Sequence, residues 1–272
     1  MKSASLRYSV LGAGILLVLL LMVPVIPSLA SARGVVGPSM ADAVHPGTAA
    51  AAMLAAVAAC TLVGAVVGRL INAVVGLFVV GCGLAVVAMR SGTVMDIAFG
   101  GGSLRPVALE TLAWGVGVAV ISIIVFRVSG PLPDIPARDP KGPFRAEVLN
   151  TDALRSMLLG LVAVAALWLA DRSEMKGQSI FAAAAGAMFI GTICRRLLGE
   201  SQPILLFAAP ILAVGVAQLI TASSLPGPLD RAVIARALPG WSLAMPLDVA
   251  AGTLLGLPLG LGWSSGGGGD ED

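Results

Sequence analysis

Long apolar runs recur along almost the whole chain, and most are close to the length that crosses a bilayer. A helix rises 1.5 Å per residue and the hydrocarbon core is about 30 Å thick, so about 20 apolar residues span it. Within lipid every backbone polar group needs an internal partner, which a helix supplies. The pattern therefore predicts an all-α polytopic membrane bundle with about eight transmembrane helices. The runs cover residues 8–30, 48–67, 70–88, 106–126, 156–170, 179–194, 203–221 and 241–263.

The composition excludes a water-facing surface of ordinary polarity. Hydrophobic residues make up 57% of the chain and charged residues 12%, whereas soluble domains carry about 25% charged residues. The mean hydropathy is +0.96. The net charge of +2 leaves no basic stripe that would neutralise a nucleic-acid backbone. We expect the lipid bilayer as the surroundings and no nucleic-acid partner.

A polar segment rich in proline divides the chain into two apolar blocks. Five prolines lie between Pro131 and Pro143, so no continuous helix is expected there. The predicted organisation is an N-terminal membrane half of four spans at 1–126, a linker at 127–154 and a C-terminal membrane half of four spans at 155–263. The acidic, glycine-rich end at 264–272 is expected to be disordered.

The first run and two short runs each leave an alternative open. Residues 8–30 are long enough for a span, but Ala30-Ser31-Ala32 resembles a signal-peptide cleavage site. We favour the span. Residues 156–170 and 179–194 would cover only about 22–24 Å as helices, less than the hydrocarbon core. Whether they cross the membrane completely is left open.

The positions of Lys and Arg suggest how the chain is threaded. The apolar runs on either side of Arg69 and Asn72 predict a tight helical hairpin, in which Arg69 is a positive-inside anchor and Asn72 a turn residue. With the N-terminus in the cytoplasm, ten Lys and Arg residues lie inside and seven outside. We expect a multi-pass protein of the cell membrane, a plasma or bacterial inner membrane, with both termini cytoplasmic.

The two halves resemble each other. Residues 63–71 align with 190–198, which matches Arg69 with Arg196. Trp114 lies as far beyond Arg69 as Trp241 lies beyond Arg196. An even number of spans per half predicts a parallel repeat. The alternative is that spans rich in Ala, Val and Gly resemble one another by composition alone.

Asp248 is the strongest candidate for a functional residue because it lies in the last apolar run, 241–263. A carboxylate at the centre of a span costs about 2.5–3.5 kcal/mol. Asp248 shares a helical face with Gly252, Gly256 and Gly260, which would let another helix approach, so it should face the bundle. It is either a proton- or ion-coupling carboxylate or, because Pro246 and Pro258 interrupt the run, the cap of a shorter helix. We favour the cap.

The remaining polar residues do not form a recognisable active site. The single histidine, His45, and three dispersed cysteines offer no metal site, and the sequence has no phosphate-binding loop or nucleophile elbow. Glu110 is expected as an interfacial charge and Gln218 as an interhelical hydrogen-bonding group. We therefore expect no catalytic residue and no cofactor. The favoured function is a non-catalytic scaffold or subunit of a membrane assembly, formed with a second copy or another membrane protein. The alternative is a small-molecule or ion transporter or channel that uses Asp248.

Overall fold

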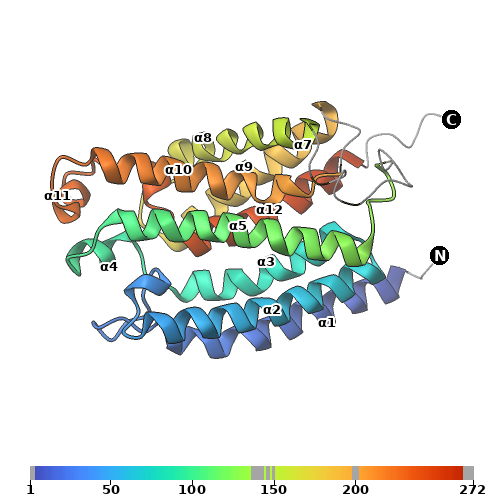
Figure 1. Cartoon of the computed structure of the whole chain (residues 1–272), viewed down its shortest axis with the longest axis horizontal. Coiled ribbons are helices and arrows are strands. Elements are labelled where there is room, and N and C mark those ends of the chain that lie inside the picture. Colours follow the sequence, from blue (N-terminus) through green and yellow to red (C-terminus); the bar gives the residue numbers. More distant parts are fainter. Residues whose placement is uncertain (1–3, 136–143, 145–147, 149–150, 198–201, 266–272) are drawn as a thin grey trace.

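The protein, in a computed structural model, is a bundle of long helices that lie side by side (Figure 1). The structure describes residues 4–135, 144, 148, 151–197 and 202–265. Over these ranges the chain is helical and contains no β-strand, apart from isolated β-bridges that join Ala30 to Val36 and Ser31 to Ala43. The prediction of an all-α polytopic bundle is confirmed.

The N-terminal half contributes four long helices and one short one. The first apolar run forms a helix that ends in a 3₁₀ segment and packs against the next two long helices. Its Gly14 lies against Val67 and Val79, and its Val18 is fully buried. The elements are α1 (Ala4–Met22) with η1 (Val23–Leu29), η2 (Met40–Asp42), α2 (Pro46–Leu70), α3 (Ala73–Arg90), α4 (Val94–Phe99) and α5 (Leu104–Ser129).

In the C-terminal half the two short apolar runs belong to longer helices. Residues 151–170 are helical throughout, and the next helix has 22 residues, about 33 Å. The sequence underestimated both lengths because polar residues form their first turns. The elements are α7 (Thr151–Ser156), η3 (Met157–Leu159), α8 (Gly160–Ala170), α9 (Lys176–Leu197), η4 (Leu205–Phe207), α10 (Ala209–Ser224), α11 (Leu229–Ile234), η5 (Gly240–Ser242) and α12 (Pro246–Ser265).

Seven helical segments of the described chain are long and apolar enough to cross a membrane. They are α1 with η1, α2, α3, α5, the α7–α8 segment, α9 and α10. Helix α12 is an additional long helix that lies inside the bundle, where it packs chiefly against α9 and α3. Its Val249, Leu254 and Leu257 are at most 1% exposed. The expected number of about eight spans is therefore a close approximation.

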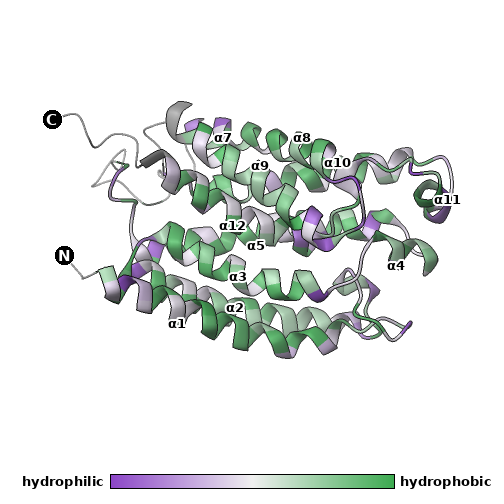
Figure 2. Cartoon of the chain, turned by 180° about the vertical axis from the view of Figure 1, so that it is seen from behind, coloured by the Kyte–Doolittle hydropathy of each residue, from purple (hydrophilic) through white to green (hydrophobic). Residues whose placement is uncertain are grey.

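Successive long helices run in alternate directions (Figure 1). One end of the bundle holds the start of α1, the end of α12 and the hairpin between α2 and α3 (Figure 1). The opposite end holds η2, α4 and α11, and we call it the loop end (Figure 1). Apolar residues cover the lengths of the helices, and several polar residues gather near the ends (Figure 2). Which end faces the cytoplasm stays a prediction.

The two halves pack against each other along their length. Helix α5 packs on α10, with Gly115 against Leu212 and Gly215 against Leu112. Helix α3 packs on α12, with Gly81 against Leu254. The third long helix of each half thus meets the fourth of the other, which is the arrangement that a parallel repeat would give. The repeat and the domain boundaries stay predictions.

Candidate functional site: a buried ion pair at the loop end

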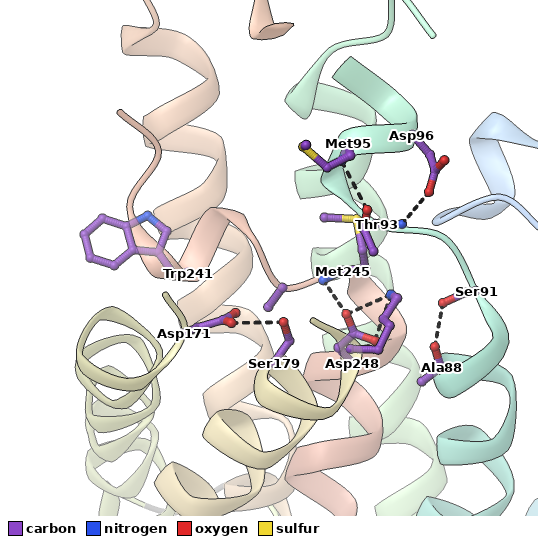
Figure 3. Close-up of polar contacts among 12 residues, drawn as sticks. Ala88, Ser91, Thr93, Met95, Asp96, Asp171, Ser179, Trp241, Met245 and Asp248 are labelled. Atoms are coloured by element: carbon purple, nitrogen blue, oxygen red, sulfur yellow. Dashed lines mark hydrogen bonds and ion pairs between the residues drawn. The ribbon is translucent and has the colours of Figure 1, made fainter. Parts of the chain in front are cut away.

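Asp248 lies in the first turn of α12 and caps this helix. Helix α12 begins at Pro246, whose fixed φ suits the first helical position. The Met245 backbone N–H donates to Asp248 Oδ2 at 2.9 Å (Figure 3). This contact satisfies one of the free N–H groups at the helix start. Asp248 therefore caps the start of α12 through the backbone N–H that precedes the helix. Pro258, which we expected to interrupt the run, lies inside the continuous helix.

Lys176 forms an ion pair with Asp248. Its Nζ atom donates to Oδ1 at 3.0 Å and to Oδ2 at 2.9 Å. The side chains of Lys176 and Asp248 are 12% and 1% exposed, respectively. Lys176 is the first residue of α9 and Asp248 is the third residue of α12, so the pair joins the starts of two helices. Because water is almost excluded, each charge depends on the other for stabilisation.

A second buried carboxylate, Asp171, lies near this pair at the end of α8. Its Oδ1 accepts a hydrogen bond from Ser179 Oγ at 3.1 Å (Figure 3), and its Oδ2 has no partner within the described ranges. Burial raises the pKa of Asp171 to about 7, and the charge of Asp248 adds to this effect. The Ser179 hydrogen bond and the Lys176 charge lower the pKa. The dominant effect is burial, which disfavours the charged form of this carboxyl.

The glycine face of α12 brings α9 close to it. Gly252 lies against the Ile180 carbonyl, Gly256 against Ala184 and Gly260 against the Met188 carbonyl. A Cβ added at Gly256 or Gly260 would collide with the backbone of α9. Asp248 and the three glycines thus lie on one face of α12, and this face packs on α9.

The predicted Arg69, Asn72 and Arg196 do not take part in this site. Asn72 is the N-cap of α3, since its Oδ1 accepts from the Val75 backbone N–H at 2.9 Å. Arg69 is exposed in the last turn of α2. Both belong to the hairpin at the end opposite the loop end. Arg196 lies in α9, and its side chain is outside the described part of the structure.

Gln218 forms the expected interhelical hydrogen bonds. The Thr111 hydroxyl of α5 donates to Gln218 Oε1 at 2.6 Å. Gln218 Nε2 donates to the carbonyl oxygens of Trp241 at 3.0 Å and Ala244 at 2.8 Å. Gln218 therefore joins α10 to α5 and to the segment that leads into α12.

Glu110 has a role that the sequence did not reveal. We expected an interfacial charge, but its side chain is buried and its Oε2 accepts from the backbone N–H groups of Met40 at 2.9 Å and Ala41 at 3.4 Å. Glu110 therefore fastens the loop between α1 and α2 to α5. The only available signal was a carboxylate at the fifth position of the apolar run 106–126.

The described residues contain no group of three or more His, Cys, Asp or Glu side chains that could hold a metal ion. The chain matches no family model, no curated protein and no solved structure. Any function must therefore be inferred from the site itself. The Lys176–Asp248 pair can hold two helices together, and Asp171 beside it carries one carboxylate oxygen without a partner in the described residues.

Proposed function

We propose that this chain is a non-catalytic integral membrane protein that acts as a scaffold or subunit of a membrane assembly. The observation that supports the proposal most strongly is the state of Asp248. This residue is 1% exposed and is fully engaged by the Lys176 ammonium and the Met245 N–H. A carboxylate whose two oxygens are both engaged by fixed partners stabilises a helix junction, whereas a coupling carboxylate needs an oxygen that is free to take up its ion or proton.

The positions of two cavities support a structural role for the Lys176–Asp248 pair. A cavity of about 470 Å³ lies at the loop end between residues 98–104 and 222–230. A groove of about 500 Å³ lies between α2 and α5. Neither is lined by Lys176 or Asp248. The pair thus lies outside both of these spaces.

Two helices lie at the periphery of the bundle and offer the faces on which assembly can be tested. Leu16 of α1 and Leu161 of α8 are 59% and 62% exposed. On a background in which Cys60, Cys82 and Cys194 are replaced, a single cysteine at either leucine can be cross-linked in native membranes.

The expected result is a cross-link to one defined partner or to a second copy, and a particle of larger mass than the 27.2 kDa chain in mild detergent. The partner is then identified by mass spectrometry, and its recovery should fall when an arginine replaces the cross-linked leucine. A particle with the mass of one chain, with no cross-link from either face, would overturn the proposal.

Asp171 favours one second candidate, a proton-linked transporter. Its unpaired oxygen, its pKa of about 7 and its proximity to the charges of Lys176 and Asp248 are properties that proton-coupled carboxylates share. In proteoliposomes with an internal pH dye, this function predicts proton uptake that Asp171→Asn abolishes. Glu174→Gln is the matched control because Glu174 is exposed in the same loop. Equal uptake by wild type, both variants and empty liposomes would exclude this candidate.

A further inference from the structure

The cluster at the loop end contains two buried carboxyl groups and one ammonium. Asp171 and Asp248 are 0% and 1% exposed, and Lys176 is paired with Asp248. Figure 3 shows Asp171, Ser179 and Asp248 close together where α8, α9 and α12 meet. With both carboxyls ionised, one negative charge would remain in the interior without a counter-charge. Burial disfavours such a charge, so a proton on one of the two carboxyls is the simplest way to balance the cluster.

The backbone around Asp171 keeps this side chain away from water. The Asp171 N–H donates to the Leu167 carbonyl at 2.9 Å, which ties the residue to the end of α8. Gly240 lies directly on the Leu167 and Asp171 carbonyl groups, where an added Cβ would collide with them. The segment 240–245 that begins there carries no charged side chain. It covers the end of α8 without supplying a counter-charge.

The charged groups that act on Asp171 come from α9 and α12. Lys176 of α9 favours the ionised form of Asp171, and Asp248 of α12 opposes it. Helix α8 contains no charged residue, and Arg172 and Glu174 of the same turn are exposed. Ionisation of Asp171 would therefore draw on the ammonium that Asp248 already uses.

The hydrogen bonds indicate which carboxyl carries the proton. Both oxygens of Asp248 accept from Lys176 Nζ, and Oδ2 also accepts from the Met245 N–H. Donors of this kind stabilise an ionised carboxylate. Asp171 has one donor, Ser179 Oγ, and its buried Oδ2 has no partner within the described ranges. The proton therefore belongs on Oδ2 of Asp171. The pKa of Asp171, raised by burial to about 7, agrees with this assignment.

We propose that Asp171 is a proton-binding group that controls the Lys176–Asp248 pair. When Asp171 is protonated, Lys176 belongs to Asp248 alone, and the starts of α9 and α12 are held together. When Asp171 releases its proton to water, two carboxylates compete for one ammonium, and the contact between the starts of α9 and α12 is weakened. This switch is a property of the helix contact and rests on neither of the two proposed functions.

The first measurement detects the proton on Asp171. Infrared spectra of the full chain in detergent micelles, recorded from pH 5 to pH 8, show the C=O stretch of protonated carboxyls. The difference between wild type and Asp171→Asn should contain one such band, which disappears as the pH rises through about 7. Glu174→Gln, which removes an exposed carboxyl of the same turn, should leave the band unchanged.

Two outcomes of this measurement would overturn the proposal. One is a difference spectrum without a protonated carboxyl at pH 5, where an ordinary aspartate is ionised. The other is an ionised Asp171 together with a stability that rises with the sodium concentration, which would assign a metal cation to Asp171 in place of the proton.

Two variants test the coupling to the ion pair, because they should shift the Asp171 titration in opposite directions. Asp248→Asn removes a repelling charge and frees Lys176, so the band should disappear at a pH lower than in wild type by about one unit or more. Lys176→Met removes the ammonium, so the band should disappear at a correspondingly higher pH. The Asp248→Asn shift is decisive alone if Lys176→Met does not fold. An unchanged titration in Asp248→Asn would refute the switch.

Amide hydrogen exchange reports on the helix contact itself. At pH 8 the amides of Met245 and of residues 247–249 should exchange severalfold faster in wild type than in Asp171→Asn, in which Lys176 has no competing carboxylate. At pH 5 the two proteins should exchange equally. Comparison at the same pH removes the intrinsic effect of pH on exchange. Equal exchange of the two proteins at both pH values would show that Asp171 does not control the pair.

Discussion

The Lys176–Asp248 pair can be tested by a double-mutant cycle whose magnitudes follow from its burial. Lys176→Met leaves a carboxylate that is 1% exposed without its counter-charge. Breaking a buried pair by removing one partner costs about 3–5 kcal/mol. Asp248 keeps its hydrogen bond from Met245, so we expect a loss near the lower limit, about 3 kcal/mol in the free energy of unfolding.

Asp248→Asn should cost less than Lys176→Met. The asparagine oxygen can still accept from Met245, and the Lys176 side chain, 12% exposed at the loop end, can turn its ammonium toward water. We expect a loss of about 2 kcal/mol. The double variant has no charge left to stabilise, so its unfolding free energy should lie within about 1 kcal/mol of wild type.

The assay is reversible unfolding by sodium dodecyl sulfate in mixed micelles, followed by helical circular dichroism. The expected coupling energy between Lys176 and Asp248 is well above 2 kcal/mol, beyond what residues without contact show. Glu174→Gln, an exposed carboxylate of the same loop, should change the free energy by less than about 0.5 kcal/mol. A double variant whose loss equals the sum of the two single losses would refute the buried pair.

Three further changes test other parts of the structure. Burial raises the folded-state pKa of Asp171 from 3.8 to about 7, so ionisation of Asp171 destabilises the fold as the pH rises toward 7. The unfolding free energy of Asp171→Asn, relative to that of wild type, should therefore be higher at pH 8 than at pH 5. The same difference between variant and wild type at both pH values would contradict this. Gly256→Ala brings a Cβ against Ala184 and should cost about 1–3 kcal/mol in the same unfolding assay, whereas Gly262→Ala meets no atom and should be nearly neutral. Gln218→Leu leaves the Trp241 and Ala244 carbonyl groups without their side-chain donor, while the Thr111 hydroxyl can still donate to the Val107 carbonyl. We expect a loss of about 1–3 kcal/mol, again measured as unfolding free energy.

The fold could be predicted because the bilayer imposes it on the sequence. Length and hydropathy suffice to locate apolar helices, since lipid excludes other spanning structures for a chain of this pattern. The same reasoning failed at helix ends. Lys176 and Thr151 are polar residues in the first turns of α9 and α7, and hydropathy assigns such residues to loops.

The candidate site was predicted only in part. The spacing of Asp248 and the three glycines defined one helical face, and that face is the one that packs on α9. The partner of Asp248 could not be identified, because Lys176 is separated from it by 72 residues. Periodicity describes one helix at a time and does not show which helix lies opposite.

The glycine face explains why Lys176 is the residue that meets Asp248. Ile180, Ala184 and Met188 lie opposite Gly252, Gly256 and Gly260 with a constant separation of 72 residues, and Lys176 and Asp248 have the same separation. Two helices that run in the same direction in one register bring these positions together turn by turn. A slip by one turn would place Asp248 opposite Ile180 and leave its charge buried without a counter-charge, at a cost of several kcal/mol. The glycines thus set the distance between α9 and α12, and the ion pair selects the register.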